Sequence, residues 1–185
     1  MVETQLPNWS LELGPDRLVR EGDIVGISLV TDLPFDERQS VVWTPYVGCG
    51  PCIPQVFLAD TTFLLSLAIT DVDGCRITDS LLIRVIPAPK VYAPNVFSPA
   101  SSDANNTFQL FAGAGVARFR SLRVYDRWGG QVFGATDFLP GDKAGQWDGR
   151  FNGSMLNPAV FIWVAEVEGL SGEVVLMEGD VTLER

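Results

Sequence analysis

The sequence predicts an all-β protein made of two tandem Ig-like antiparallel β-sandwich domains. Short runs of β-branched and aromatic residues alternate with turns along the chain, which contains 18 Gly and 12 Pro. No segment of about ten residues places apolar side chains at the 3.6-residue period of a helix. Hydrophobic residues make up 46% of the chain, enough for packed cores and too many for a disordered protein.

Residues 1–88 are expected to form the first sandwich. Asp73-Gly74 separates its two longest strand-like runs, and Asp-Gly is a strong signal for a hairpin turn. Trp43 lies in a middle strand and is the expected core aromatic. The expected strands are residues 10–13, 23–30, 40–44, 61–70 and 77–86.

Residues 89–185 are expected to form the second sandwich. The boundary is placed at Pro87 and Pro89, because proline has no N–H to donate to a β-ladder. A long Gly/Asp/Pro-rich excursion over residues 134–158 interrupts the strand pattern. The expected strands are residues 91–97, 107–111, 119–126, 131–133, 160–168 and 173–183.

The charge and residue usage exclude several classes of function. With 23 acidic and 13 basic residues the net charge is −10, and such a surface repels phosphate backbones, so nucleic acid is not an expected partner. The absence of histidine excludes Ser-His-Asp and Cys-His catalysis and removes the commonest metal ligand. We therefore expect a protein that is not an enzyme and that holds no metal or cofactor.

The N-terminus shows no basic and apolar leader, and no apolar run reaches the roughly 18 residues of a membrane span. Either the protein stays inside the cell or the chain is a fragment whose signal peptide lies upstream.

Three cysteines, Cys49, Cys52 and Cys75, form the most reactive-looking group. A Cys-x-x-Cys redox site would need a helix after its first cysteine, and a zinc site would need a fourth ligand. The sequence offers neither, which favours a structural disulfide. The pairing stays open, although a bond from Cys49 or Cys52 to Cys75 would close a longer loop than Cys49–Cys52 and stabilise more.

The sequence contains two predicted turns that combine an aromatic residue, an aspartate and a glycine. They are residues 124–130 (VYDRWGG) and 147–149 (WDG). Asp126 is expected to accept hydrogen bonds from turn N–H groups, and Arg127 to pair with it or with an acidic loop. Gly129 and Gly130 are expected to supply positive φ angles. Trp147-Asp148-Gly149 is expected to build a second turn beside the first, so that the two form a rigid loop platform at one end of the sandwich.

Five motifs follow one another in the second half: residues 93–99 (APNVFSP), 106–108 (NTF), 124–129 (VYDRWG), 147–149 with Asn152-Gly153, and 179–183 (GDVTL). In this order they resemble the gliding-motility-associated C-terminal domain, the type B sorting domain of the type IX secretion system of Bacteroidetes-type bacteria. Residues 9–86 more loosely resemble the Ig/PKD-like repeats that precede such domains in surface adhesins.

The resemblance implies a folded address label at the end of a large surface protein. Its implied partners are the type IX translocon and a dedicated outer-membrane partner protein, and its implied destination is the cell surface or the medium, through the periplasm. We take as candidate partner-recognition residues Asp126, Arg127, Trp128, Gly129, Trp147, Asp148, Gly149 and Asn152.

The family's loop after Phe-Ser/Thr-Pro is usually Asn-Gly-Asp-Gly-x-Asn-Asp, which looks like a string of calcium ligands. Here residues 100–106 read ASSDANN, with Asp103 as the only acid, so calcium is not expected. The alternative function is a carbohydrate-binding or adhesive module, in which Trp128, Trp147 and Trp163 stack on a surface polysaccharide.

Overall fold

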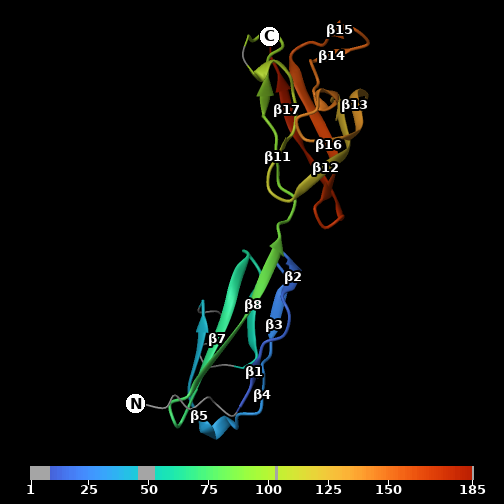
Figure 1. Ribbon diagram of the computed structural model, residues 1–185. Coiled ribbons are helices and arrows are strands. Elements are labelled where there is room, and N and C mark those ends of the chain that lie inside the picture. The colour runs from blue at the N-terminus through green and yellow to red at the C-terminus, as the bar shows by residue number, and fades with distance from the viewer. Residues whose placement is uncertain (1–8, 46–52, 103, 185) are drawn as a thin grey trace. The chain divides into compact units, whose positions relative to one another are not determined.

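The structure, a computed structural model, describes residues 9–45, 53–102 and 104–184. The chain divides into two compact units, Met1–Pro87 and Ala88–Arg185, one residue from the expected boundary. In the described residues the only helical segments are the 3₁₀ turns Phe35–Glu37, Ala104–Asn106 and Lys143–Gly145. The all-β prediction is confirmed (Figure 1).

The first unit packs a four-stranded sheet against two short strand pairs. Its core is lined by alternate residues of the long strands, such as Leu65, Leu67 and Ile69. The sheet has the order β2 (Arg17–Arg20), β8 (Arg76–Ile86), β7 (Phe63–Asp71) and β5 (Arg38–Thr44), and the pairs are β3 (Ile24–Ile27) with β6 (Gln55–Leu58) and β1 (Leu11–Glu12) with β4 (Val30–Thr31).

The turn between β7 and β8 is organised by Asp71, which is 7% exposed. Its carboxylate accepts hydrogen bonds from the Trp9 indole (2.9 Å) and from the N–H groups of Cys75 (2.8 Å) and Asp73 (3.0 Å). Gly74 has the positive φ of +84° that the predicted Asp-Gly hairpin needs.

These contacts predict an acid-sensitive contribution to the stability of the first unit. The Trp9 hydrogen bond, reinforced by the backbone N–H groups, lowers the pKa of Asp71 below its ordinary value. The carboxylate therefore stabilises the folded state above the unfolded-state pKa of about 3.9, and this stabilisation is lost as the pH falls through the lower folded-state value. We expect Trp9→Phe to reduce the unfolding free energy more at pH 7 than at pH 3, as measured by urea unfolding. A deficit that does not change with pH would contradict this role of Asp71.

The second unit has one five-stranded sheet and a smaller opposing layer. The sheet has the order β10 (Val96–Phe97), β17 (Val174–Leu183), β16 (Ala159–Gly169), β12 (Val116–Tyr125) and β13 (Gln131–Phe138). The smaller elements are β9 (Val91–Tyr92) paired with β11 (Phe111–Ala112), the hairpin β14 (Arg150–Phe151) with β15 (Ser154–Met155), and a bridge between Phe108 and Trp147. The core of this unit lies on the inward-facing side of β16, where Phe161, Trp163, Ala165 and Val167 are buried.

The structure refines the strand prediction at the edges. Pro94 divides the expected strand 91–97 into β9 and β10, which belong to different sheets. β10 pairs in parallel with β17, and β2 pairs in parallel with β8, whereas the sequence predicted antiparallel pairs only.

Two predicted features lie wholly or partly outside the described residues: the disulfide and the loop that contains Asp103. Cys49 and Cys52 are not described, so the disulfide stays a prediction; Cys75 is half-buried after the β7–β8 turn. Asp103 is likewise outside the description. Across residues 9–45, 53–102 and 104–184, no helix has the length and apolar character needed to cross a membrane.

Candidate partner-recognition site

The turn between β12 and β13 is held by Asp126, as predicted. Its Oδ1 atom accepts hydrogen bonds from the N–H groups of Trp128 (2.9 Å) and Gly130 (2.8 Å). Gly129 has a φ of +84° and donates its N–H to the Asp126 carbonyl (3.0 Å), which is typical of a three-residue hairpin loop. Gly130 does not have a positive φ, so that expectation was wrong; a Cβ there would lie 3.0 Å from Asp126 Oδ2, so the glycine makes room for the carboxylate.

We expect Asp126→Ala to lower the unfolding free energy of the second unit by about 1–2 kcal/mol, because two N–H groups lose their acceptor. Asp126→Asn keeps one side-chain oxygen and is expected to restore most of this loss. Urea unfolding of the three proteins measures it, and an Asn variant as unstable as the Ala variant would contradict the capping role.

Arg127 and Trp128 form an exposed pair at the tip of this turn. The indole of Trp128 is 72% exposed, and the Arg127 guanidinium carbon lies 3.9 Å from the centre of the ring. Arg127 therefore makes a cation–π contact in place of the expected ion pair with Asp126. The stacking holds two long side chains in one arrangement on the surface.

A pocket of about 180 Å³ lies beside the exposed pair. Asp126, Arg127 and Trp128 form one wall, and residues that precede or begin β16, among them Leu156 and Val160, form another. The outer face of β16 continues this surface with Val160 and Ile162, which are 51% and 46% exposed.

Trp147 is not on the surface, although the sequence placed it among the recognition residues. It is 1% exposed, and its ring packs 5.3 Å from that of Phe97 and 5.0 Å, edge to face, from that of Phe161. Its indole N–H donates to the Arg150 carbonyl (3.0 Å), and its backbone N–H and C=O pair with Phe108 at 2.8 Å each. In the folded unit Trp147 therefore supports the turn from below and does not stack on Trp128.

The residues after Trp147 form a second turn. Asp148 accepts a hydrogen bond from the Arg150 N–H (3.1 Å), and its carboxylate lies 3.6 Å from Arg150 Nε. Gly149 has a φ of +77°, and a Cβ there would lie 2.9 Å from Leu183 Cδ1 and 3.0 Å from Pro99 Cγ. Asn152 (φ +50°) and Gly153 (φ +81°) form the hairpin turn between β14 and β15.

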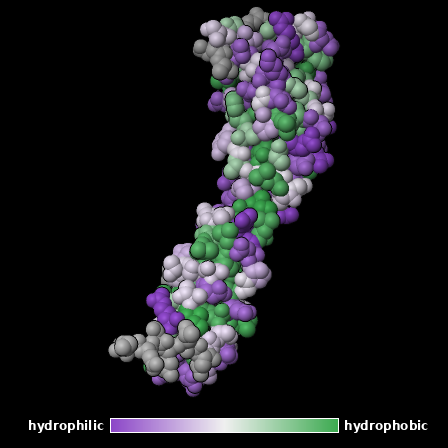
Figure 2. Space-filling model, viewed as in Figure 1, coloured by the Kyte–Doolittle hydropathy of each residue, from purple (hydrophilic) through white to green (hydrophobic). Residues whose placement is uncertain are grey.

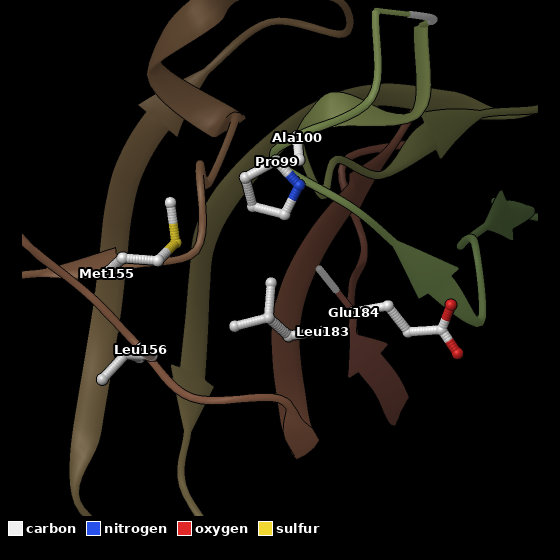
Figure 3. Close-up of a pocket in the computed structure, with 6 residues that line it drawn as sticks. All are labelled: Pro99, Ala100, Met155, Leu156, Leu183 and Glu184. Atoms are coloured by element: carbon white, nitrogen blue, oxygen red, sulfur yellow. The ribbon is translucent and has the colours of Figure 1, made fainter.

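A second pocket, of about 270 Å³, lies between this segment and the end of β17. Figure 3 shows Pro99, Met155 and Leu183 around it, with the Glu184 carboxylate pointing away. Leu156 lines both pockets and donates its N–H to the Gly149 carbonyl (3.0 Å), so the second predicted turn borders the same surface as the first. We call this surface the loop platform; it comprises residues 126–130 and 148–158, together with Pro99, Ala100, Leu183 and Glu184.

The sequence did not identify the apolar members of the platform, Met155, Leu156 and Leu183. The signal for Met155 and Leu156 was their position shortly after Asn152-Gly153, and Leu183 lies within the motif of residues 179–183. Within the part of the chain that the structure describes, no three His, Cys, Asp or Glu side chains gather as metal ligands would.

Residues 91–179 match the profile of the CHU_C type IX secretion signal domain. No curated protein matches the chain.

Solved structures with similarity to the chain come from several kinds of protein. The insect immune protein hemolin is 12% identical with a TM-score of 0.48, over 94% of this chain and 46% of that one. Drosophila N-cadherin EC1-4 is 15% identical with a TM-score of 0.46, over 97% and 50%. The Bacteroides ovatus mixed-linkage glucan utilization locus protein SGBP-B, in complex with a mixed-linkage heptasaccharide, is 16% identical with a TM-score of 0.35, over 94% and 44%. The chain thus spans about half the length of each of these proteins.

The profile match covers both turns of the loop platform and ends within β17. The second unit of this chain therefore carries a match to the type IX secretion signal domain family, which supports a sorting role for this unit.

Proposed function

We propose that the second unit is recognised, as a folded domain, through its loop platform by the type IX translocon and a dedicated outer-membrane partner protein. The observation that carries the proposal is the exposed pair Arg127–Trp128 beside an apolar pocket. Tryptophan and arginine are the residues most enriched among those that dominate binding energy at protein interfaces.

The side chains of the exposed pair are already held in one arrangement before a partner binds. Asp126 fixes the hairpin turn from within, and the Arg127 guanidinium already stacks on the Trp128 ring. The buried Trp147 and the close contacts of Gly149 fix the neighbouring turn. A partner that binds this surface therefore pays little conformational entropy.

Two apolar pockets that share Leu156 give the site concave surfaces into which a partner's side chains can fit. Apolar side chains of a partner could fill both while its polar groups meet Arg127 and Asp148 at the rim. This arrangement, an apolar centre with a charged edge, is typical of protein interfaces.

The first unit is proposed to serve as a spacer or adhesive repeat of a larger exported protein. Its described residues form a sandwich with its own core, which suits a repeat in a surface protein.

The carbohydrate-binding alternative loses most of its support. Trp147 and Trp163 are 1% and 7% exposed, so the three tryptophans cannot form one stacking surface. One face of Trp128 is covered by Arg127, which leaves a single ring face for a sugar. A shift of tryptophan fluorescence on titration with polysaccharide, lost in Trp128→Ala, would restore this alternative.

The direct test fuses a signal peptide and a fluorescent reporter to the N-terminus of the 185-residue chain in a gliding bacterium with type IX secretion. We expect the reporter to reach the cell surface or the medium in the parent strain, and to stay in the periplasm in a strain that lacks the translocon. Retention in the periplasm in both strains, with the cognate partner protein present, would overturn the proposal that the chain carries a sufficient signal.

A further inference from the structure

The edge strand β17 leaves most of one side unpaired. β10 covers only its last residues, through the pairs Val96–Thr182 and Phe97–Leu183. The opposite side of β17 pairs with β16 along its whole length. Among the described residues, no backbone hydrogen bond on the β10 side reaches residues 174–180.

The direction of the unpaired backbone groups follows from the two bonds that do form. Thr182 donates its N–H to the Asn95 carbonyl, and Glu184 donates its N–H to the Phe97 carbonyl. The backbone N–H and C=O groups of the even-numbered residues therefore point toward the β10 side. Because the direction alternates along a strand, the N–H and C=O groups of Val174, Leu176, Glu178 and Asp180 also point to this open edge. They span about 20 Å, at roughly 3.3 Å per residue.

Apart from the acidic Glu178 and Asp180, the open edge lacks the usual protection against pairing. Residues 174–180 (VVLMEGD) contain no proline and no lysine, and no bulge separates them from β16. Hydrophobic residues are exposed between hydrophilic ones on the face drawn in Figure 2, and within β17 Leu176 is 64% exposed.

The side chains of β17 define what an added strand must carry. On the outer face, Glu178 and Asp180 are exposed and form no ion pair with any residue that the structure describes. On the inner face, Val175 and Met177 are half-buried, and Met177 packs against the core at the edge of the sandwich. Because side chains alternate between faces, a complementary strand alternates basic residues over the acids with apolar residues over Met177.

A second copy of this chain fits the edge poorly. Antiparallel pairing of two β17 edges would place both copies of Glu178 and Asp180 on one face, with no cation between them. Each chain also carries a net charge of −10, so long-range repulsion opposes the approach.

We propose that the open edge of β17 is a strand-addition site for an extended segment of a partner protein in which basic and apolar residues alternate. The main-chain groups of Val174 to Asp180 supply the affinity, and the acids on one face with Met177 on the other select the sequence. The site uses a different surface from the loop platform, so either can be correct without the other.

The test measures the binding of a short fluorescein-labelled peptide of alternating lysine and valine to the 185-residue chain by fluorescence anisotropy at low salt. We expect saturable binding to the parent. The matched control peptide carries an N-methyl group on every backbone amide; it keeps every side-chain charge but has no N–H to donate on either edge, and we expect its affinity to be at least about tenfold lower.

Variants of the chain locate the binding surface. Leu176→Pro removes an N–H that points to the open edge and forms no bond to β16, so the fold is expected to survive, and binding is expected to fall about tenfold. The double variant Glu178→Lys/Asp180→Lys keeps the backbone and is also expected to weaken binding. Glu12→Lys, an exposed change in β1 of the first unit, is expected to leave it unchanged.

Four results would overturn the proposal: absence of saturable binding, equal binding of the N-methylated peptide, parental binding by a folded Leu176→Pro variant, and parental binding by the charge-reversed chain. Sedimentation of the parent as a dimer that Leu176→Pro dissociates would make a second copy the occupant, and would equally overturn it.

Discussion

Replacing both Arg127 and Trp128 with alanine is expected to lower export of the reporter fusion at least about tenfold while the fold is kept. Trp128 is 72% exposed and the Arg127 side chain rests on its ring, so their removal opens no cavity in the core. The Asp126 hydrogen bonds that hold the turn use backbone N–H groups and survive both changes. The measurement is the ratio of surface and medium fluorescence to periplasmic fluorescence.

A matched double variant controls for the loss of one exposed apolar side chain and one exposed cation. Leu139 is 56% exposed and Lys143 is exposed, and both follow the end of β13 that lies away from the 126–130 turn. Leu139→Ala/Lys143→Ala is expected to be exported like the parent. Parental export of the Arg127/Trp128 variant would show that the platform is not recognised, and equal loss in both variants would indicate a general effect of surface change.

The features predicted best from the sequence are those set by local chemistry. Asp126 caps its turn because its carboxylate lies two and four residues from the N–H groups it accepts, a relation visible in the sequence. The Asp73-Gly74 turn follows from the positive φ that glycine tolerates, which Gly74 adopts. The long strands β7, β8, β16 and β17 carry enough alternating apolar residues to be predicted as strands from the sequence.

Trp147 was misplaced because its burial depends on residues far away in the chain. It lies in a glycine-rich segment with no periodic pattern of hydrophobic residues. Such a segment does not indicate whether an aromatic side chain points into the core or toward solvent. Phe97 and Phe161 enclose it, and neither is near it in sequence. The pockets that share Leu156 were missed for the same reason, because their walls come from separate segments.

The shorter strands were missed because edge strands need little hydrophobic pattern. β2 reads RLVR, with an arginine at each end, and it is identified only by its parallel pairing with β8. β13 continues through Gly134 and through Asp137 at a φ of +58°, two residues that predict a turn when considered alone. Pairing with β12 overrides this local preference.

Replacing Trp147 with alanine is expected to lower the unfolding free energy of the second unit by about 3–5 kcal/mol, a large fraction of the stability of a domain of this size. The change empties a space between Phe97 and Phe161 and leaves the Arg150 carbonyl without its indole donor. Amide hydrogen exchange of β16, followed by NMR, reports on this unit separately from the first, and its protection is expected to fall by about two to four powers of ten.

The same measurement on Trp128→Ala distinguishes a side chain that stabilises the platform from one that contacts the partner. Replacing this exposed tryptophan is expected to change the unfolding free energy by no more than about 0.5 kcal/mol, because it lies on the surface of the platform and not in the core beneath it. If Trp147→Ala loses export together with hydrogen-exchange protection, while Trp128→Ala loses export alone, then Trp147 acts by holding the platform in shape and Trp128 by contacting the partner. Full protection in Trp147→Ala would contradict the structural role, because a side chain 1% exposed and enclosed by aromatic rings cannot be removed from a packed core without cost.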